Sequence, residues 1–77
     1  MLSPEKITIE LTNREALVLF EWLARTNQSP PQTLFEDDAE ARALSDLEAL
    51  LEKVLTEPLD SRYKEYLAEA RAGVRGA

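Results

Sequence analysis

The sequence predicts a mainly α-helical fold, a three-helix bundle-like domain with one short N-terminal β-strand. Three observations support this class. Apolar residues recur at helical spacing in three stretches, proline-containing segments separate these stretches, and only residues 6–11 alternate between apolar and polar side chains as a half-buried strand does. The chain has 77 residues, which we expect to form a single domain, 1-77.

The predicted strand covers residues 6–11, where apolar side chains occupy alternate positions at Ile7, Ile9 and Leu11. A lone strand leaves its backbone hydrogen-bonding groups unpaired, so it needs a neighbour. The neighbour is either residues 32–35 of the same chain or the equivalent strand of a second copy. The sequence leaves both alternatives open.

The first helix is predicted over about residues 13–26. Thr12 and Glu15 have the spacing of a capping box, in which each side chain bonds to the backbone amide of the other residue. Pro30 and Pro31 follow and end the helical region, because proline has no amide hydrogen and restricts the residue before it.

The second helix is predicted over about 37–57, with Asp37 as its N-cap; Thr33 is an alternative cap. Pro58 ends it. Its apolar side chains share one arc when projected at about 100° per residue. The members of this predicted core arc are Ala43, Leu44, Leu47, Leu50, Leu51, Val54 and Leu55.

The third helix is predicted over about 60–72, with Asp60 or Ser61 as its N-cap and Gly73 as its C-terminal stop. Its apolar arc is narrower than that of the second helix. The members of that arc are Tyr63, Tyr66, Leu67, Ala70 and Val74.

The first helix is apolar on more than one side. Its main arc is Ala16, Leu17, Leu19, Phe20, Leu23 and Ala24, and Val18 and Trp22 lie outside it among charged residues. Three interpretations of this second stripe stay open: the strand of the same chain covers it, another chain covers it, or Trp22 is an ordinary surface residue. Under the second interpretation the candidate interface is Val18, Trp22, Ile7 and Ile9, and we expect a homodimer formed by strand pairing.

The formal net charge is −6, and residues 36–57 hold eight of the 15 acidic residues but only two basic ones. We therefore expect no nucleic-acid binding, because phosphates would be repelled by this segment. The same segment suggests an alternative function, a toxin-neutralising or immunity-type protein that covers a basic site with Glu48 and Glu52.

No catalytic, cofactor-binding or metal site is predicted, and we expect the protein not to be an enzyme. The chain has no histidine and no cysteine, so imidazole bases, thiolate nucleophiles and ordinary zinc sites are excluded. No small-molecule substrate is identifiable. The longest apolar run, residues 16–20, is far shorter than the roughly 20 residues of a membrane span. The absence of cysteine and of a signal-peptide pattern favours the cytoplasm.

The order of a strand, "LTNREALVLFEWL", an acidic helix and "EPLDSRYKEYLAEAR" resembles a group of short uncharacterised bacterial proteins. The resemblance covers nearly the whole chain and implies a bacterial source and a compact domain. It implies no activity and no site residues. We therefore expect a small acidic protein that acts as a non-catalytic protein–protein interaction or accessory module.

Overall fold

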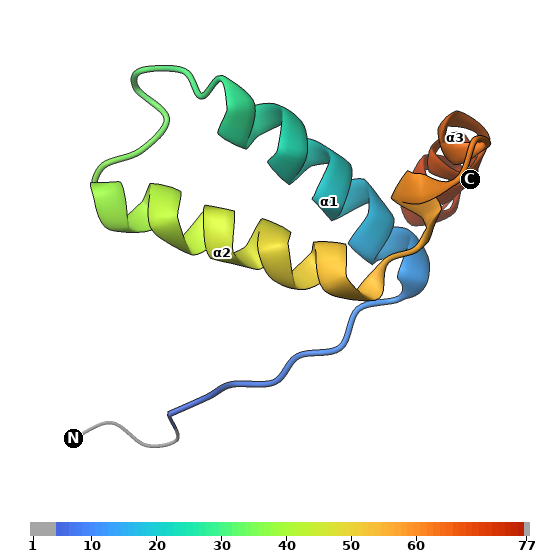
Figure 1. Ribbon diagram of the computed structural model, residues 1–77, viewed down its shortest axis with the longest axis horizontal. Helices are drawn as coiled ribbons and strands as arrows, with labels where there is room; N and C mark the ends of the chain where they lie inside the picture. The colour runs from blue at the N-terminus through green and yellow to red at the C-terminus, as the bar shows by residue number, and fades with distance from the viewer. Residues whose placement is uncertain (1–4, 77) are drawn as a thin grey trace.

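The computed structural model describes residues 5–76, and within them the fold is mainly helical. The elements are α1 (Asn13–Gln28), α2 (Asp38–Val54), a 3-10 turn η1 (Glu57–Leu59) and α3 (Tyr63–Arg75). Helices α1 and α2 run side by side in opposite directions, and α3 lies beside the N-terminal half of α1 (Figure 1). None of these helices combines the length and apolar content that a membrane crossing requires.

Helix α1 is the central element, because both α2 and α3 pack against it while α2 and α3 scarcely touch each other. This arrangement explains why α1 is apolar on more than one side. The buried residues come from all three helices, together with Leu55, the C-cap of α2. They are Ala16, Leu17, Leu23, Leu51, Leu55, Leu67 and Ala70.

The predicted capping box at the start of α1 is present. The Thr12 hydroxyl accepts from the Glu15 amide at 3.0 Å, and the Glu15 carboxylate accepts from the Thr12 amide at 2.9 Å. The helix continues to Gln28, so Asn27 belongs to its last turn. The Asn27 side-chain amide donates to Glu48 of α2 at 2.8 Å and thereby joins the two helices.

Helix α2 begins after Asp37, whose carboxylate accepts a hydrogen bond from the Ala39 amide. Of the two predicted N-caps, Asp37 is therefore confirmed and Thr33 is not. It ends at Val54 rather than near Glu57. A helix that continued through Pro58 would need a proline amide to donate to the Val54 carbonyl, and proline has none. The chain instead turns at Leu55, which is buried, and enters η1.

Helix α3 starts at Tyr63, later than predicted, and neither Asp60 nor Ser61 is its N-cap. Asp60 instead accepts from the Arg62 amide at 2.8 Å in the turn before the helix. The helix also runs past Gly73 and ends at Arg75. Its C-cap is Gly76, whose φ of 80° lies in the left-handed region that glycine adopts without steric cost.

The predicted strand is not seen: no strand is formed within residues 5–76, and residues 6–11 lead away from the helices (Figure 1). Ile7 and Ile9 are 84% and 72% exposed, so this segment does not fold back over α1. Residues 32–35, the predicted neighbour within the chain, form a turn and bend instead of a strand. The alternation therefore has no partner strand in the described part of one chain.

Candidate interaction surface

The apolar arc predicted for α2 is divided in two by the packing. Leu51 and Leu55 are buried against α1, whereas Leu50 and Val54 are 60% and 72% exposed. In helical projection these two exposed residues lie on the flank of the arc that is turned away from Leu51 and Leu55. A single neighbouring helix covers only part of so wide an arc, and α3 does not reach this flank. The prediction that the whole arc is core was wrong for Leu50 and Val54, and also for Ala43, which is exposed.

The exposed flank of α2 borders a shallow groove of about 300 Å³. Its walls come from the N-terminal segment, from the first turn of α1 and from the second half of α2. The lining residues are Ile9, Leu11, Ala16, Leu47, Leu50, Leu51 and Val54, and all of them are apolar. Ile9 and Leu11 thus face the same groove as the α2 flank, on the apolar side of the alternating segment.

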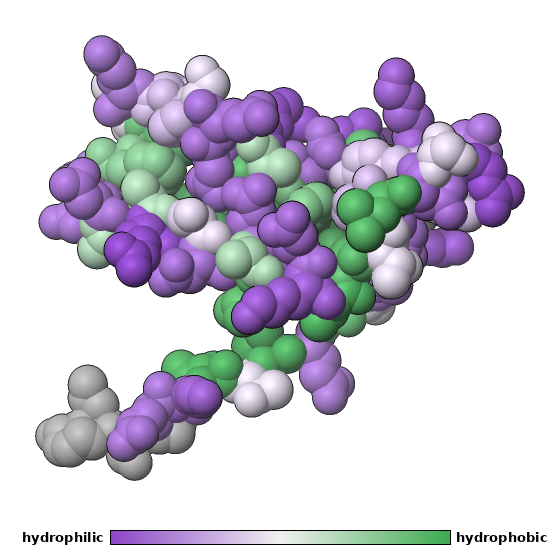
Figure 2. Space-filling view, in the orientation of Figure 1, coloured by the Kyte–Doolittle hydropathy of each residue, from purple (hydrophilic) through white to green (hydrophobic). Residues whose placement is uncertain are grey.

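Hydrophobic surface gathers in the same place in the space-filling view. Figure 2 shows it along the N-terminal segment and around the adjoining C-terminal end of α2, whereas much of the remaining face is hydrophilic. We call the exposed residues of this region the apolar surface and define it by Ile7, Ile9, Leu11, Leu50 and Val54. Contiguous apolar patches of this kind on small proteins commonly mark interaction sites.

The four residues of the predicted interface do not lie together in one patch. Ile7 and Ile9 belong to the apolar surface, and Ile9 lines the groove. Val18 is partly buried and packs against the core, so another element of the chain already covers much of it. Trp22 is 39% exposed but is not among the residues that line the groove.

The sequence interpretation did not include Leu50 and Val54 in this surface. Their spacing of four residues puts them on one face of α2, which is also the spacing of core residues, so periodicity alone does not separate the two roles. The width of the α2 arc could have indicated that some of its residues are exposed, because the arc is wider than one packed helix covers.

The alternative acidic face is partly occupied by contacts within the chain. Glu48 is partly buried and accepts the hydrogen bond from Asn27, so it takes part in α1–α2 packing. Glu52 is exposed. Elsewhere on α2, Asp46 lies 3.4 Å from Arg42 in an exposed ion pair.

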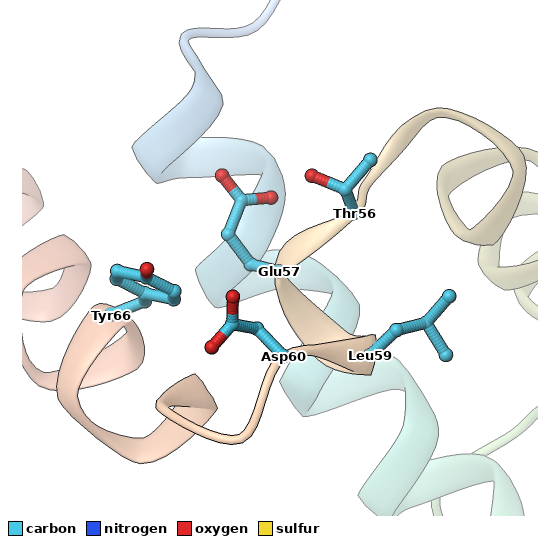
Figure 3. A pocket seen from close by; sticks show the side chains of 5 residues that line it. All are labelled: Thr56, Glu57, Leu59, Asp60 and Tyr66. Carbon is cyan, nitrogen blue, oxygen red and sulfur yellow. The ribbon is translucent and has the colours of Figure 1, made fainter.

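A second hollow, of about 520 Å³, opens beside η1 and is lined by Thr56, Glu57, Leu59, Asp60 and Tyr66 (Figure 3). Leu59 points away from the other four side chains and is 91% exposed. The Asn13 amide donates to Glu57 at 2.8 Å and is the largest cause that lowers the pKa of this carboxyl, followed by backbone amides of Glu57 and Thr56. Glu57 is therefore ionised at neutral pH and is poorly suited to act as a general acid.

Two other polar side chains of this hollow, Asp60 and Tyr66, are in contact with Arg62. Its guanidinium donates to the Tyr66 hydroxyl at 2.6 Å and lies over the Tyr66 ring, and it is 3.9 Å from Asp60. Among residues 5–76 no three acidic side chains converge as ligands of a metal ion would. The side-chain contacts around this hollow thus connect η1 to α1 through Asn13 and to α3 through Arg62.

Comparison of the chain with protein-family models, with curated proteins and with solved structures finds no match.

Proposed function

We propose that this protein is a non-catalytic protein-interaction module that buries its apolar surface against another polypeptide chain. The observation that supports this most is the groove between Ile9 and Val54, which is apolar on every side and is left open by the packing of α2 on α1 alone. Burying an exposed aliphatic side chain contributes about 1.5 to 3 kcal/mol for full burial. Burial of five such side chains would oppose the roughly 4 to 15 kcal/mol that association costs in translational and rotational freedom.

The proposal places the protein in the cytoplasm as an accessory subunit. The chain has no cysteine, as is usual for proteins of reducing compartments. A chain of this size also gains stability when a partner binds only its folded state, because binding shifts the folding equilibrium. The acidic-face alternative has less support, since Glu48 is already used in contacts with α1.

Site-specific photo-crosslinking in the source cell tests this proposal. A photoreactive amino acid replaces Val54 or Ile9, both of which are exposed and lie at the groove. The matched control carries the same group at Lys64, which is exposed on α3. We expect crosslinks to a protein from positions 54 and 9 but not from position 64. Equal yields from all three positions would contradict the proposal.

A further inference from the structure

The segment that carries part of the apolar surface has a symmetric pattern of its own. Residues 6–10 read Lys-Ile-Thr-Ile-Glu, so Thr8 has an isoleucine on each side and charges of opposite sign beyond them. Within the described part of the chain, none of the backbone hydrogen bonds involves these residues. Their amides and carbonyls are therefore available to a strand from another molecule.

This pattern fits antiparallel pairing of the segments of two chains about a two-fold axis through Thr8. Residues directly opposite each other in such a pair point to the same face of the ribbon. In this register Ile7 of one copy lies opposite Ile9 of the other, twice, and all four isoleucines share one face. The two copies of Thr8 lie opposite each other on the second face.

The charged residues agree with the same register. It places Lys6 of one copy opposite Glu10 of the second copy, so the ribbon has two cross-strand pairs of opposite charge. Neither residue forms an ion pair with another described residue of its own chain, and both are exposed. Parallel in-register pairing would instead put Lys6 beside Lys6 and Glu10 beside Glu10, which is repulsive. A shift by one residue would place isoleucine opposite a polar residue.

A two-stranded ribbon by itself is marginal in water and needs an apolar cover. The α2 flank provides one, because Ile9 and Leu11 already face Leu50 and Val54 across the groove. The apolar face of the paired ribbon is therefore the face that lies toward α2. Strand pairing and burial of the α2 flank then occur in one association step.

We propose that the partner at the apolar surface is a second copy of this chain, bound through an antiparallel two-stranded ribbon centred on Thr8 with reciprocal Lys6–Glu10 pairs. This inference rests on the proposed function, since it names the chain that buries the surface. The charge pattern favours this partner, because a second copy of the segment carries the complementary charges at the matching positions.

Charge exchange tests the register. Lys6→Glu makes both cross-strand pairs acidic, and Glu10→Lys makes both basic, so each variant alone should dimerise with a Kd raised about tenfold or more at low salt. The double variant Lys6→Glu/Glu10→Lys restores two opposite pairs and should recover the wild-type Kd. An equimolar mixture of the two single variants should form heterodimers, because each then supplies the charge that the other lacks.

The measurement is sedimentation velocity over a hundredfold range of concentration, with circular dichroism to follow the helices. Lys6 and Glu10 lie outside every helix and are exposed, so the helical signal should be the same in all four proteins. Trp22→Ala, which changes an exposed residue away from the groove, should dimerise like wild type. A wild type that stays monomeric, single variants that dimerise unchanged, or dimers that only Trp22→Ala abolishes would each overturn the inference.

The crosslinking experiment separates this inference from the proposed function. Products of twice the chain mass from positions 54 and 9 support both. Products with a different protein, together with a monomeric wild type in sedimentation, leave the interaction module in place and overturn the self-association.

Discussion

The Tyr63 hydroxyl donates a hydrogen bond of 2.7 Å to the Glu21 carboxylate and so joins the start of α3 to the middle of α1. Both residues are partly buried. This contact adds to the packing of α3, whose main helix neighbour is α1.

Removal of this hydroxyl should weaken the fold. Tyr63→Phe keeps the ring and deletes a hydrogen bond to a charged acceptor, so we expect the free energy of unfolding to fall by about 1 to 2 kcal/mol. Urea denaturation followed by circular dichroism measures the change. The matched control is Tyr66→Phe, whose hydroxyl bonds to exposed Arg62 and whose loss should cost less than about 0.5 kcal/mol. Equal effects of the two substitutions would contradict this assignment.

Alkaline pH should destabilise the protein through the same residue. Burial raises the pKa of Tyr63 above its ordinary value of 10.0, and the hydrogen bond and negative charge of Glu21 raise it further. The unfolded chain therefore loses this proton at a lower pH than the folded chain does. The contribution of this pKa shift to the free energy of unfolding is fully present below about pH 10 and decreases as the pH rises above that value.

Unfolding of wild type and Tyr63→Phe from about pH 8 to pH 11 measures this dependence. The stability difference between the two proteins should shrink as the pH rises above 10, because only wild type has the shifted phenol. A stability difference that is constant with pH would show that Tyr63 is not responsible for the loss of stability at alkaline pH.

The capping box of α1 should contribute measurably to stability. Thr12→Ala removes the acceptor for the Glu15 amide and should cost about 1 kcal/mol. Thr33→Ala is the control, because Thr33 is exposed and lies in the loop before α2. Thermal or urea unfolding should show little change for Thr33→Ala. Thr12→Ala with wild-type stability would mean that the hydroxyl does not stabilise the helix start.

Two neighbouring leucines of α2 should separate folding from association. Leu51 is 7% exposed and Leu50 is 60% exposed. At a concentration where the protein is monomeric, Leu51→Ala should cost about 2 to 5 kcal/mol of unfolding free energy, whereas Leu50→Ala should cost less than about 1 kcal/mol. Leu50→Ala should instead weaken self-association in sedimentation. The reverse order of stabilities would show that α2 is rotated relative to the packing described above.

The sequence by itself determined the local structure where a side chain acts on its own backbone or a neighbouring one. The Thr12–Glu15 box, the Asp37 cap and the breaks at Pro31 and Pro58 depend on hydrogen bonds and sterics within a few residues, and three helices follow from them. The exact ends were less predictable. Both Gly73 and Gly76 are residues that can end a helix, and the structure has Gly76 as the C-cap of α3.

The tertiary structure decided which apolar residues are core and which are surface. Periodicity reports that Leu50, Leu51, Val54 and Leu55 share an arc, but exposure depends on how many neighbours pack against that arc. Because α3 packs against α1 and not against α2, half of the arc stays open. The alternation of residues 6–11 likewise indicates a strand, yet a strand exists only when another strand supplies its hydrogen bonds, and one chain provides none within residues 5–76.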